Sequence, residues 1–195
     1  MSHKSISYSV LIVSKNENLN TTLGTLLDDK INSTKHFAKE PNEARAILSK
    51  NHYDFIIINA PSELTPTLRF TLSLFHEKES IILLLVKAND YKAIYERTAE
   101  HGIFLLAKPL SKQTLFTALS CMISARERIR SLEQEVHSAE EKAKELVLTN
   151  RAKWLLITKL SMSEEQAHRY IEKQAMDRCV SRKNISQEII TNYSK

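Results

Sequence analysis

The stretch DFIIIN at residues 54–59 decides the fold. Its four successive apolar residues predict a strand covered on both faces, as in a parallel sheet, and the stretch ends in the amide Asn59. Further strand candidates are residues 8–13, a short piece near 34–38, 81–86 and 103–106, and three of the five candidates are near-continuous apolar runs. Helical patterns occupy residues 17–29, 41–50, 67–76, 91–100 and a segment after Ser111. This alternation predicts five βα units around a parallel sheet.

Ligands of such sheets collect at the carboxyl ends of the strands, so the residues at those ends matter most. Ala107-Lys108-Pro109-Leu110 follows the fifth expected strand, and with this layout residues 6–122 resemble a response-regulator receiver domain. The resemblance implies a lysine, here Lys108, that contacts a phosphoryl group on an aspartate after strand three. Asn59 stands at that aspartate position, Ser14 and Lys15 replace the acidic pair that holds Mg²⁺, and Lys87 replaces a hydroxyl residue.

A degenerate phosphoacceptor pocket is therefore expected, made of Ser14, Lys15, Asn59, Lys87 and Lys108. Because Mg²⁺ needs oxygen ligands, preferably anionic ones, we predict no metal, no cofactor and no phosphoryl transfer here. Two interpretations stay open. Either Lys108 and Pro109 serve the loop geometry and Asn59 caps a strand end, or the three lysines form an anion site. Glu17, Glu63 or Asp90 would equally neutralise the lysines.

A stretch without Gly or Pro, residues 110–161, predicts that the last receiver helix continues into a much longer one. Its apolar residues repeat at intervals of three and four, which is typical of a coiled coil. The expected dimer seam is Met122, Ala125, Ile129, Leu132, Val136, Ala139, Ala143 and Leu146. Continuing the repeat places Asn150, Lys153, Ile157 and Leu160 on the seam, and the two polar residues predict that the helices splay there. The alternative is an amphipathic helix packed on its own receiver, and flanking charges leave the orientation of a pair open.

Three helices are expected in residues 146–193. The first ends near Ser161, a capping box Ser163-Glu164-Glu165-Gln166 begins the second, and the third begins near Ser181. Expected inward positions are Ala167, Tyr170, Ile171, Ala175, Ile185, Ile189, Ile190 and Tyr193. This segment resembles the ANTAR domain, the RNA-binding output domain of transcription antiterminators, through Ala152-Lys153, Leu155-Leu156, Met162-Ser163-Glu164-Glu165-Gln166-Ala167 and Ala175-Met176. Departures from the family pattern are Trp154 for a glycine, Glu172 for an arginine and Ser186 for an alanine.

Positive charge is concentrated in the same segment. Residues 149–195 carry nine Lys/Arg and five Asp/Glu, a net of +4 out of the chain's +5. Lys and Arg bind phosphates, and RNA recognition adds stacking on exposed aromatic rings. The expected RNA contacts are Arg151, Lys153, Lys159, Arg169, Lys173, Arg178, Arg182 and Lys183. His168, Tyr170 and Trp154 are the candidate stacking residues, although Tyr170 and Trp154 are more simply interpreted as core.

Length and composition agree with this organisation. The chain has 195 residues but only two glycines and four prolines, which favours helices over disorder or an all-β fold. No apolar run approaches the ~20 residues that span a bilayer, so no membrane partner and a cytoplasmic location are expected. Cys121 and Cys179 lie far apart and are interpreted as buried free thiols.

The expected fold is an α/β receiver-like (βα)5 domain at 1–122, a coiled-coil helix at 122–148 and a three-helix all-α domain at 149–195. The heptad repeat predicts a homodimer, and the resemblance implies an antiterminator that binds tandem hairpins in a leader transcript. No nucleophile stands beside a base at a motif spacing and no Gly-rich phosphate loop is present, so no enzyme activity is expected. A regulatory protein or small ligand would control it through the receiver in place of phosphate. Two alternatives stay open. One is a DNA-binding helix-turn-helix regulator that reads bases with Arg182, Lys183, Asn184 and Gln187, and the other is a signalling scaffold.

Overall fold

The computed structural model describes residues 7–30, 32–61, 64–77 and 80–193, and these fall into two compact units, residues 1–129 and 130–195. Each unit is described by itself. The long helix α5 (Lys112–Leu160) contributes its first part to one unit and its remainder to the other.

The first unit is built on five parallel strands: β1 (Ser7–Val13), β2 (Asn32–Ala38), β3 (Phe55–Asn59), β4 (Ile81–Lys87) and β5 (Phe104–Lys108). Their order in the sheet is β2-β1-β3-β4-β5, with every pairing parallel. The expected five-stranded parallel sheet is confirmed, and each strand begins and ends within two residues of its predicted limits. Central strands β3 and β4 are buried nearly throughout, as their continuous apolar runs require.

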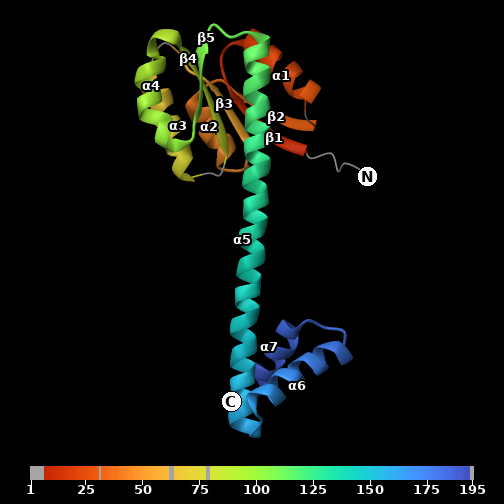
Figure 1. Ribbon diagram of the computed structural model, residues 1–195. Helices are drawn as coiled ribbons and strands as arrows, with labels where there is room; N and C mark the ends of the chain where they lie inside the picture. Colours follow the sequence, from red (N-terminus) through yellow and green to blue (C-terminus); the bar gives the residue numbers. More distant parts are fainter. Residues whose placement is uncertain (1–6, 31, 62–63, 78–79, 194–195) are drawn as a thin grey trace. The chain divides into compact units, whose positions relative to one another are not determined.

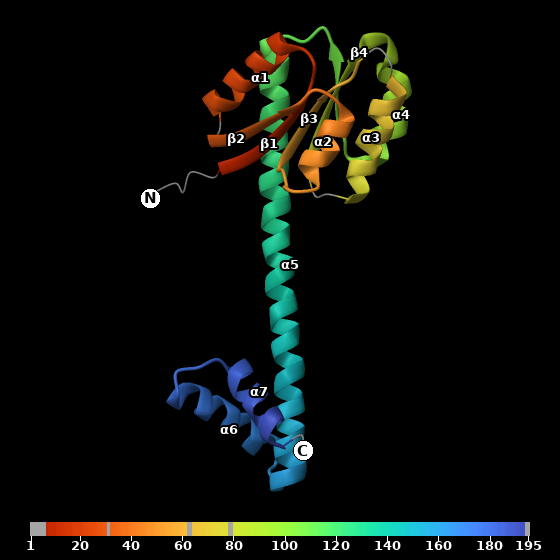
Figure 2. The same cartoon turned by 180° about the vertical axis from the view of Figure 1, so that it is seen from behind.

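Helices cover both faces of this sheet (Figures 1 and 2). One face packs against α2 (Pro41–Leu48), α3 (Leu64–Glu77) and α4 (Tyr91–Thr98) through a core that includes Ile56 and Leu84. The other packs against α1 (Glu17–Lys30) and the first part of α5, around Phe55 and Leu83. Short 3-10 turns, η1 (Ala88–Asp90) and η2 (Ala99–His101), flank α4, and Gly102 takes the left-handed conformation (φ 62°) before β5.

The first part of α5 is tied to the sheet by polar contacts as well as by its apolar face. Arg126 Nε lies 3.1 Å from Asp54 Oδ1, and both side chains are only 14 % exposed. Tyr8 donates a hydrogen bond of 2.7 Å to Glu127. Met122 is fully buried in this core and Ala125 packs against it. These two expected seam residues therefore face their own domain, and the exposed part of the expected seam begins at Ile129.

The second unit contains the remainder of α5, with α6 (Glu164–Asp177) and α7 (Arg182–Tyr193). Ser163 and Gln166 form the predicted capping box: Ser163 Oγ accepts from the backbone N–H of Gln166, and Gln166 Oε1 accepts from that of Ser163. The non-glycine residues Ser161 and Cys179 take left-handed conformations (φ 51°) in the turns on either side of α6. Nine buried residues, among them Ala152, Leu156, Ile171 and Ile189, form the core.

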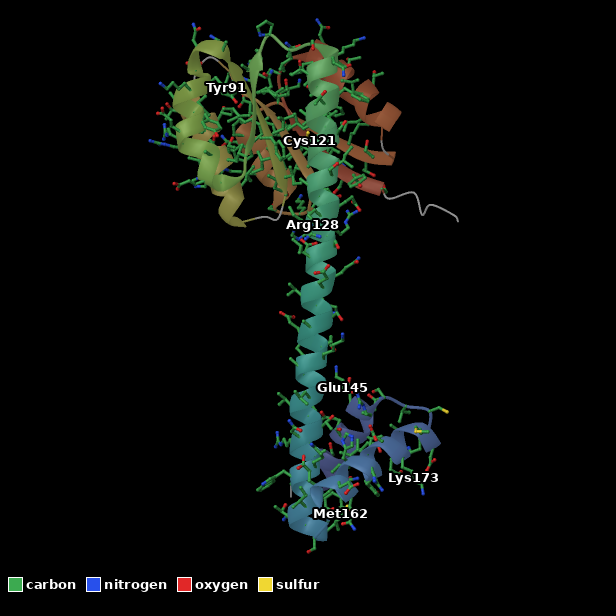
Figure 3. All side chains as sticks on the ribbon, viewed as in Figure 1. Tyr91, Cys121, Arg128, Glu145, Met162 and Lys173 are labelled. Carbon is green, nitrogen blue, oxygen red and sulfur yellow. The ribbon has the colours of Figure 1, made fainter. Side chains whose placement is uncertain are left out.

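The interpretation of both thiols as buried is wrong, because Cys121 and Cys179 are free and exposed. Cys121 lies on α5 (labelled in Figure 3), and Cys179 lies in the turn after α6. Whether an isolated cysteine is buried follows from its place in the fold, which the number and spacing of cysteines do not reveal. Within the described ranges, no helix is long and apolar enough to cross a membrane.

Candidate nucleic-acid interface and altered receiver pocket

Three of the five predicted pocket residues form one hydrogen-bonded chain at the strand ends. Lys108 Nζ donates to Asn59 Oδ1 at 2.9 Å and to the carbonyl oxygen of Ala60 at 2.8 Å. Asn59 Nδ2 in turn donates to Ser14 Oγ at 3.1 Å. The lysine therefore already has partners on its own chain. Its peptide bond to Pro109 is cis.

The other two lysines of the pocket differ in their surroundings. Lys87 is the register partner of Lys108 on the adjacent strand and is exposed. Burial, and secondly the positive charge of Lys87, lower the pKa of Lys108. Lys15 forms an ion pair of 2.5 Å with Glu40, the residue before α2, and both side chains are more than half exposed. Glu40 was missed in the sequence because it lies 25 residues from Lys15, and Glu63 falls outside the described residues.

This donor set does not fit Mg²⁺. A receiver metal site needs carboxylates after strand one and strand three, and those positions hold a hydroxyl, an ammonium group and an amide. Among the residues that the structure describes, no cluster of three His, Cys, Asp or Glu side chains is arranged to hold a metal ion. Beside the pocket lies a hollow of about 790 Å³, lined by Lys15, Lys39 and Asn59 and by apolar groups such as Ile58.

An apolar stripe continues along α5 after the receiver. Ile129 is 37 %, Leu132 42 %, Val136 58 % and Leu146 61 % exposed. Ala139 and Ala143 are exposed as well. These four large aliphatic side chains at heptad positions are therefore exposed to solvent in the single chain.

Beyond Leu146, where the sequence predicts that the helices splay, Lys153 and Ile157 are covered within their own unit. Lys153 Nζ bonds Glu164 at 3.1 Å with its side chain 17 % exposed, and Ile157 packs against the three-helix core. Val147 and Trp154 are instead exposed, at 67 % and 63 %. The core of the second unit covers the side of α5 that carries Ile157, and Glu164 of α6 binds Lys153, so this side is not available as a seam.

Five of the eight predicted RNA contacts form ion pairs within their own unit. Arg178 binds Glu188 through two hydrogen bonds of 2.6 and 2.8 Å, and this pairing raises the pKa of Arg178 and lowers that of Glu188. Arg169 pairs with Glu165, and Lys153 with Glu164. The remaining two, at the start of α7, contact α5: Arg182 pairs with Glu145 at 3.2 Å and Lys183 with Glu141 at 2.9 Å.

Hydrogen bonds from Lys183 and Lys144 hold the pKa of Glu141 at about 2. Glu172, the departure on α6, lies 3.6 Å from Arg182 and 3.2 Å from His168. Arg182 is therefore shared between two carboxylates on different helices.

Arg151, Lys159 and Lys173 are exposed and form no ion pair with any described residue. Two aromatic residues expected in the core are also at the surface: Trp154, and Tyr170 at 40 % exposure. The prediction was wrong for both because small residues and isoleucines fill the interior, with Ala152, Ala167 and Ile171 completely buried. The second unit therefore offers exposed cations and exposed rings together.

Comparison with known proteins identifies the family of the second unit. Residues 137–190 match the ANTAR domain family. The chain thus joins a domain with the receiver fold to an ANTAR domain. It is similar to the transcriptional regulatory protein PdtaR of Mycobacterium tuberculosis, with 31 % identity over 109 residues, 55 % of this chain and 53 % of PdtaR. The chain spans about half the length of the curated relatives it matches.

Solved structures resemble the first unit. The chemotaxis response regulator CheY4 of Vibrio cholerae matches with a TM-score of 0.52 and 21 % identity, over 60 % of this chain and 99 % of that one. An adenylate cyclase from Rhodopirellula baltica matches with a TM-score of 0.59 and 18 % identity, over 68 % and 98 %. At these identities the likeness shows the shared fold alone.

Proposed function

We propose that this protein is a transcription antiterminator whose ANTAR domain binds tandem hairpins in a nascent leader RNA. The observation that carries the proposal is the ANTAR match at 137–190, which overlaps the segment 149–195 that holds a net charge of +4 out of the chain's +5. Binding of hairpins as they are transcribed prevents a terminator hairpin from forming. A leader-RNA target also implies a location in the cytoplasm and regulation in place of catalysis.

The distribution of cations supports contact with phosphates. Arg151, Lys159 and Lys173 form no ion pair with any described residue, so a phosphate that binds them displaces no carboxylate. The pairs formed by Arg169 and Arg178 are exposed, and exposed pairs contribute little stability, so a phosphate replaces the carboxylate at small cost. All eight predicted contacts stay in the proposal, and the three unpaired cations are its first targets.

The proposed active form is a homodimer joined along α5. Exposed Ile129, Leu132, Val136 and Leu146 form a stripe that a second copy of the same helix covers. A dimer presents two ANTAR domains, so tandem hairpins bind more tightly through effective concentration. The division into a receiver (1–122), a coiled-coil helix (122–148) and an ANTAR domain (149–195) remains a prediction on the same basis.

The receiver is proposed to act without phosphorylation. Lys108 is already engaged by Asn59 and Ala60, and no carboxylate stands at the acceptor position. The adjacent hollow of about 790 Å³ has both cationic and apolar walls, which suits a partner protein's side chains or a small anionic ligand. A stable acyl phosphate on the protein after incubation with acetyl phosphate would refute this part of the proposal.

The decisive experiment measures binding of the full chain to RNA with two tandem hairpins, to single-hairpin RNA and to duplex DNA, over a salt series without a phosphodonor. We expect the tandem RNA to bind most tightly, with log affinity falling by ~0.7 per phosphate contact per log unit of salt. Equal affinity for all three nucleic acids, or no binding, contradicts the proposal. The second outcome favours a signalling scaffold.

The helix-turn-helix alternative ranks second, because the family match at 137–190 is to the ANTAR domain. It would read bases with Arg182 and Lys183, whose ion pairs with Glu145 and Glu141 would have to open for DNA as for RNA. Preference for duplex DNA in the same experiment would revive it.

A further inference from the structure

A hollow of about 440 Å³ lies where α5 turns into α6, entirely within the ANTAR domain. Leu160 and Met162 line it from the end of α5 and the turn, and Gln166, Arg169, Tyr170 and Lys173 line it from α6. Met162 and Lys173 are labelled in Figure 3. Its size falls within the range of small-ligand sites in proteins.

Tyr170 gives the hollow an aromatic wall. The helical pattern places this residue beside Ala167 and Ile171, but those two fill the core completely, whereas Tyr170 stays 40 % exposed. Leu160, 43 % exposed, and the half-buried Met162 add apolar surface next to it. Unpaired RNA bases stack on exposed aromatic rings, and apolar neighbours exclude water from such a stack.

Polar groups around the ring fit the rest of a nucleotide. Arg169 and Lys173 are four residues apart and share a face of α6. Lys173 has no ion-pair partner in the described parts of the chain, and the pair between Arg169 and Glu165 is about three-quarters exposed on both sides. Gln166 Oε1 is used by the capping box, so the amide orientation leaves its NH2 group to donate to a base edge.

We infer that this hollow is a nucleobase site: an unpaired base from a hairpin loop stacks on Tyr170 while Lys173 and Arg169 bind the flanking phosphates. The Gln166 amide donates to an acceptor on the base. The inference rests on the proposed RNA binding and adds where a loop base is held. An exposed ring flanked by two cations suits a nucleotide better than an apolar peptide, which needs no flanking cations.

The test begins with a pool of RNA hairpins with randomised terminal loops, from which the full-length protein selects ligands. Affinity for a selected tandem-hairpin RNA is then measured for wild type, Tyr170→Ala and Tyr170→Phe. Met176→Ala is the matched control, because Met176 lies on the same helix, is 78 % exposed and does not line the hollow. Circular dichroism checks that each variant keeps its helices.

Loss of one base stack weakens binding by roughly 5- to 150-fold, so Tyr170→Ala is expected in that range. Tyr170→Phe keeps the ring and is expected within about two-fold of wild type, as is Met176→Ala. Lys173→Gln is expected to lower the salt slope by ~0.7, one phosphate contact, while Tyr170→Phe leaves the slope unchanged. A 4-thiouridine in the loop is expected to crosslink to the peptide that contains Tyr170.

Wild-type affinity of Tyr170→Ala, or crosslinks confined to other helices, would overturn the base site and leave RNA binding standing. If wild type selects no RNA from the pool, the base site and the proposed function both fail.

Discussion

Val136→Ala tests the proposed dimer seam directly. Val136 is 58 % exposed on α5, so slightly more than half of its side chain is available to a partner helix. Val→Ala removes two methyl groups at ~0.8 kcal/mol each, so the exposed share corresponds to roughly 1 kcal/mol per chain and about 2 kcal/mol per dimer. At 1.4 kcal/mol per factor of ten, the dimer dissociation constant should rise roughly 30-fold.

Sedimentation equilibrium on the full-length protein, over a concentration series, measures that constant. Gln134→Ala is the matched control, because Gln134 is exposed on the same helix two positions away, on the opposite side. Alanine is the better helix former, so weaker helix propensity cannot account for a loss of dimer in Val136→Ala. Unchanged dimerisation in Val136→Ala, or an equal loss in Gln134→Ala, would refute the assignment of this face to a second copy.

Three further predictions concern the capping box, the altered pocket and an ion-pair cluster. Ser163→Ala removes the side-chain acceptor at the start of α6 and should lower the free energy of unfolding of the ANTAR domain by ~1 kcal/mol in urea titrations. Asn59→Asp should still retain no phosphate from acetyl phosphate by mass spectrometry, because the metal-binding acids are also replaced; a retained phosphate contradicts this. The pKa of Glu141, about 2, is below its ordinary 4.5, so its stabilising effect is present above pH 4.5 and is lost as the pH falls toward 2. Glu141→Gln should therefore flatten the decline of thermal stability in that window, whereas the control Glu140→Gln should not.

Local signals in the sequence predicted most of the fold. Uninterrupted apolar runs such as residues 55–58 identify strands buried on both faces, and the Lys108-Pro109 pair locates the end of the last strand. The capping box at Ser163 predicts the start of α6, because both of its hydrogen bonds join residues three apart in the chain. Each of these features depends on neighbours in sequence, so a single chain reveals them.

Features that depend on tertiary packing were not predictable in the same way. Glu40 neutralises Lys15 because β1 and β2 are adjacent in the sheet, a contact that no short motif encodes. Met122 obeys the heptad repeat as well as Leu132 does, yet one faces the receiver core and the other is exposed. Tyr170 and Trp154 lie outside the core because smaller residues occupy it. Apolar character alone does not show which of several apolar residues on a helix is buried.

The link between Lys108, Asn59 and Ser14 gives the altered pocket a structural role. A carboxylate only accepts hydrogen bonds, but the Asn59 amide accepts from Lys108 and donates to Ser14 at the same time. The hydroxyl of Ser14 also accepts from the backbone N–H of Asn16, so both of its lone pairs are used. The residues at positions 14 and 59 therefore complement each other, and their hydrogen bonds join the carboxyl ends of β1, β3 and β5. A phosphorylatable pocket alternates between a free and a phosphorylated aspartate, which differ in charge, whereas this hydrogen-bonded chain has a single charge state.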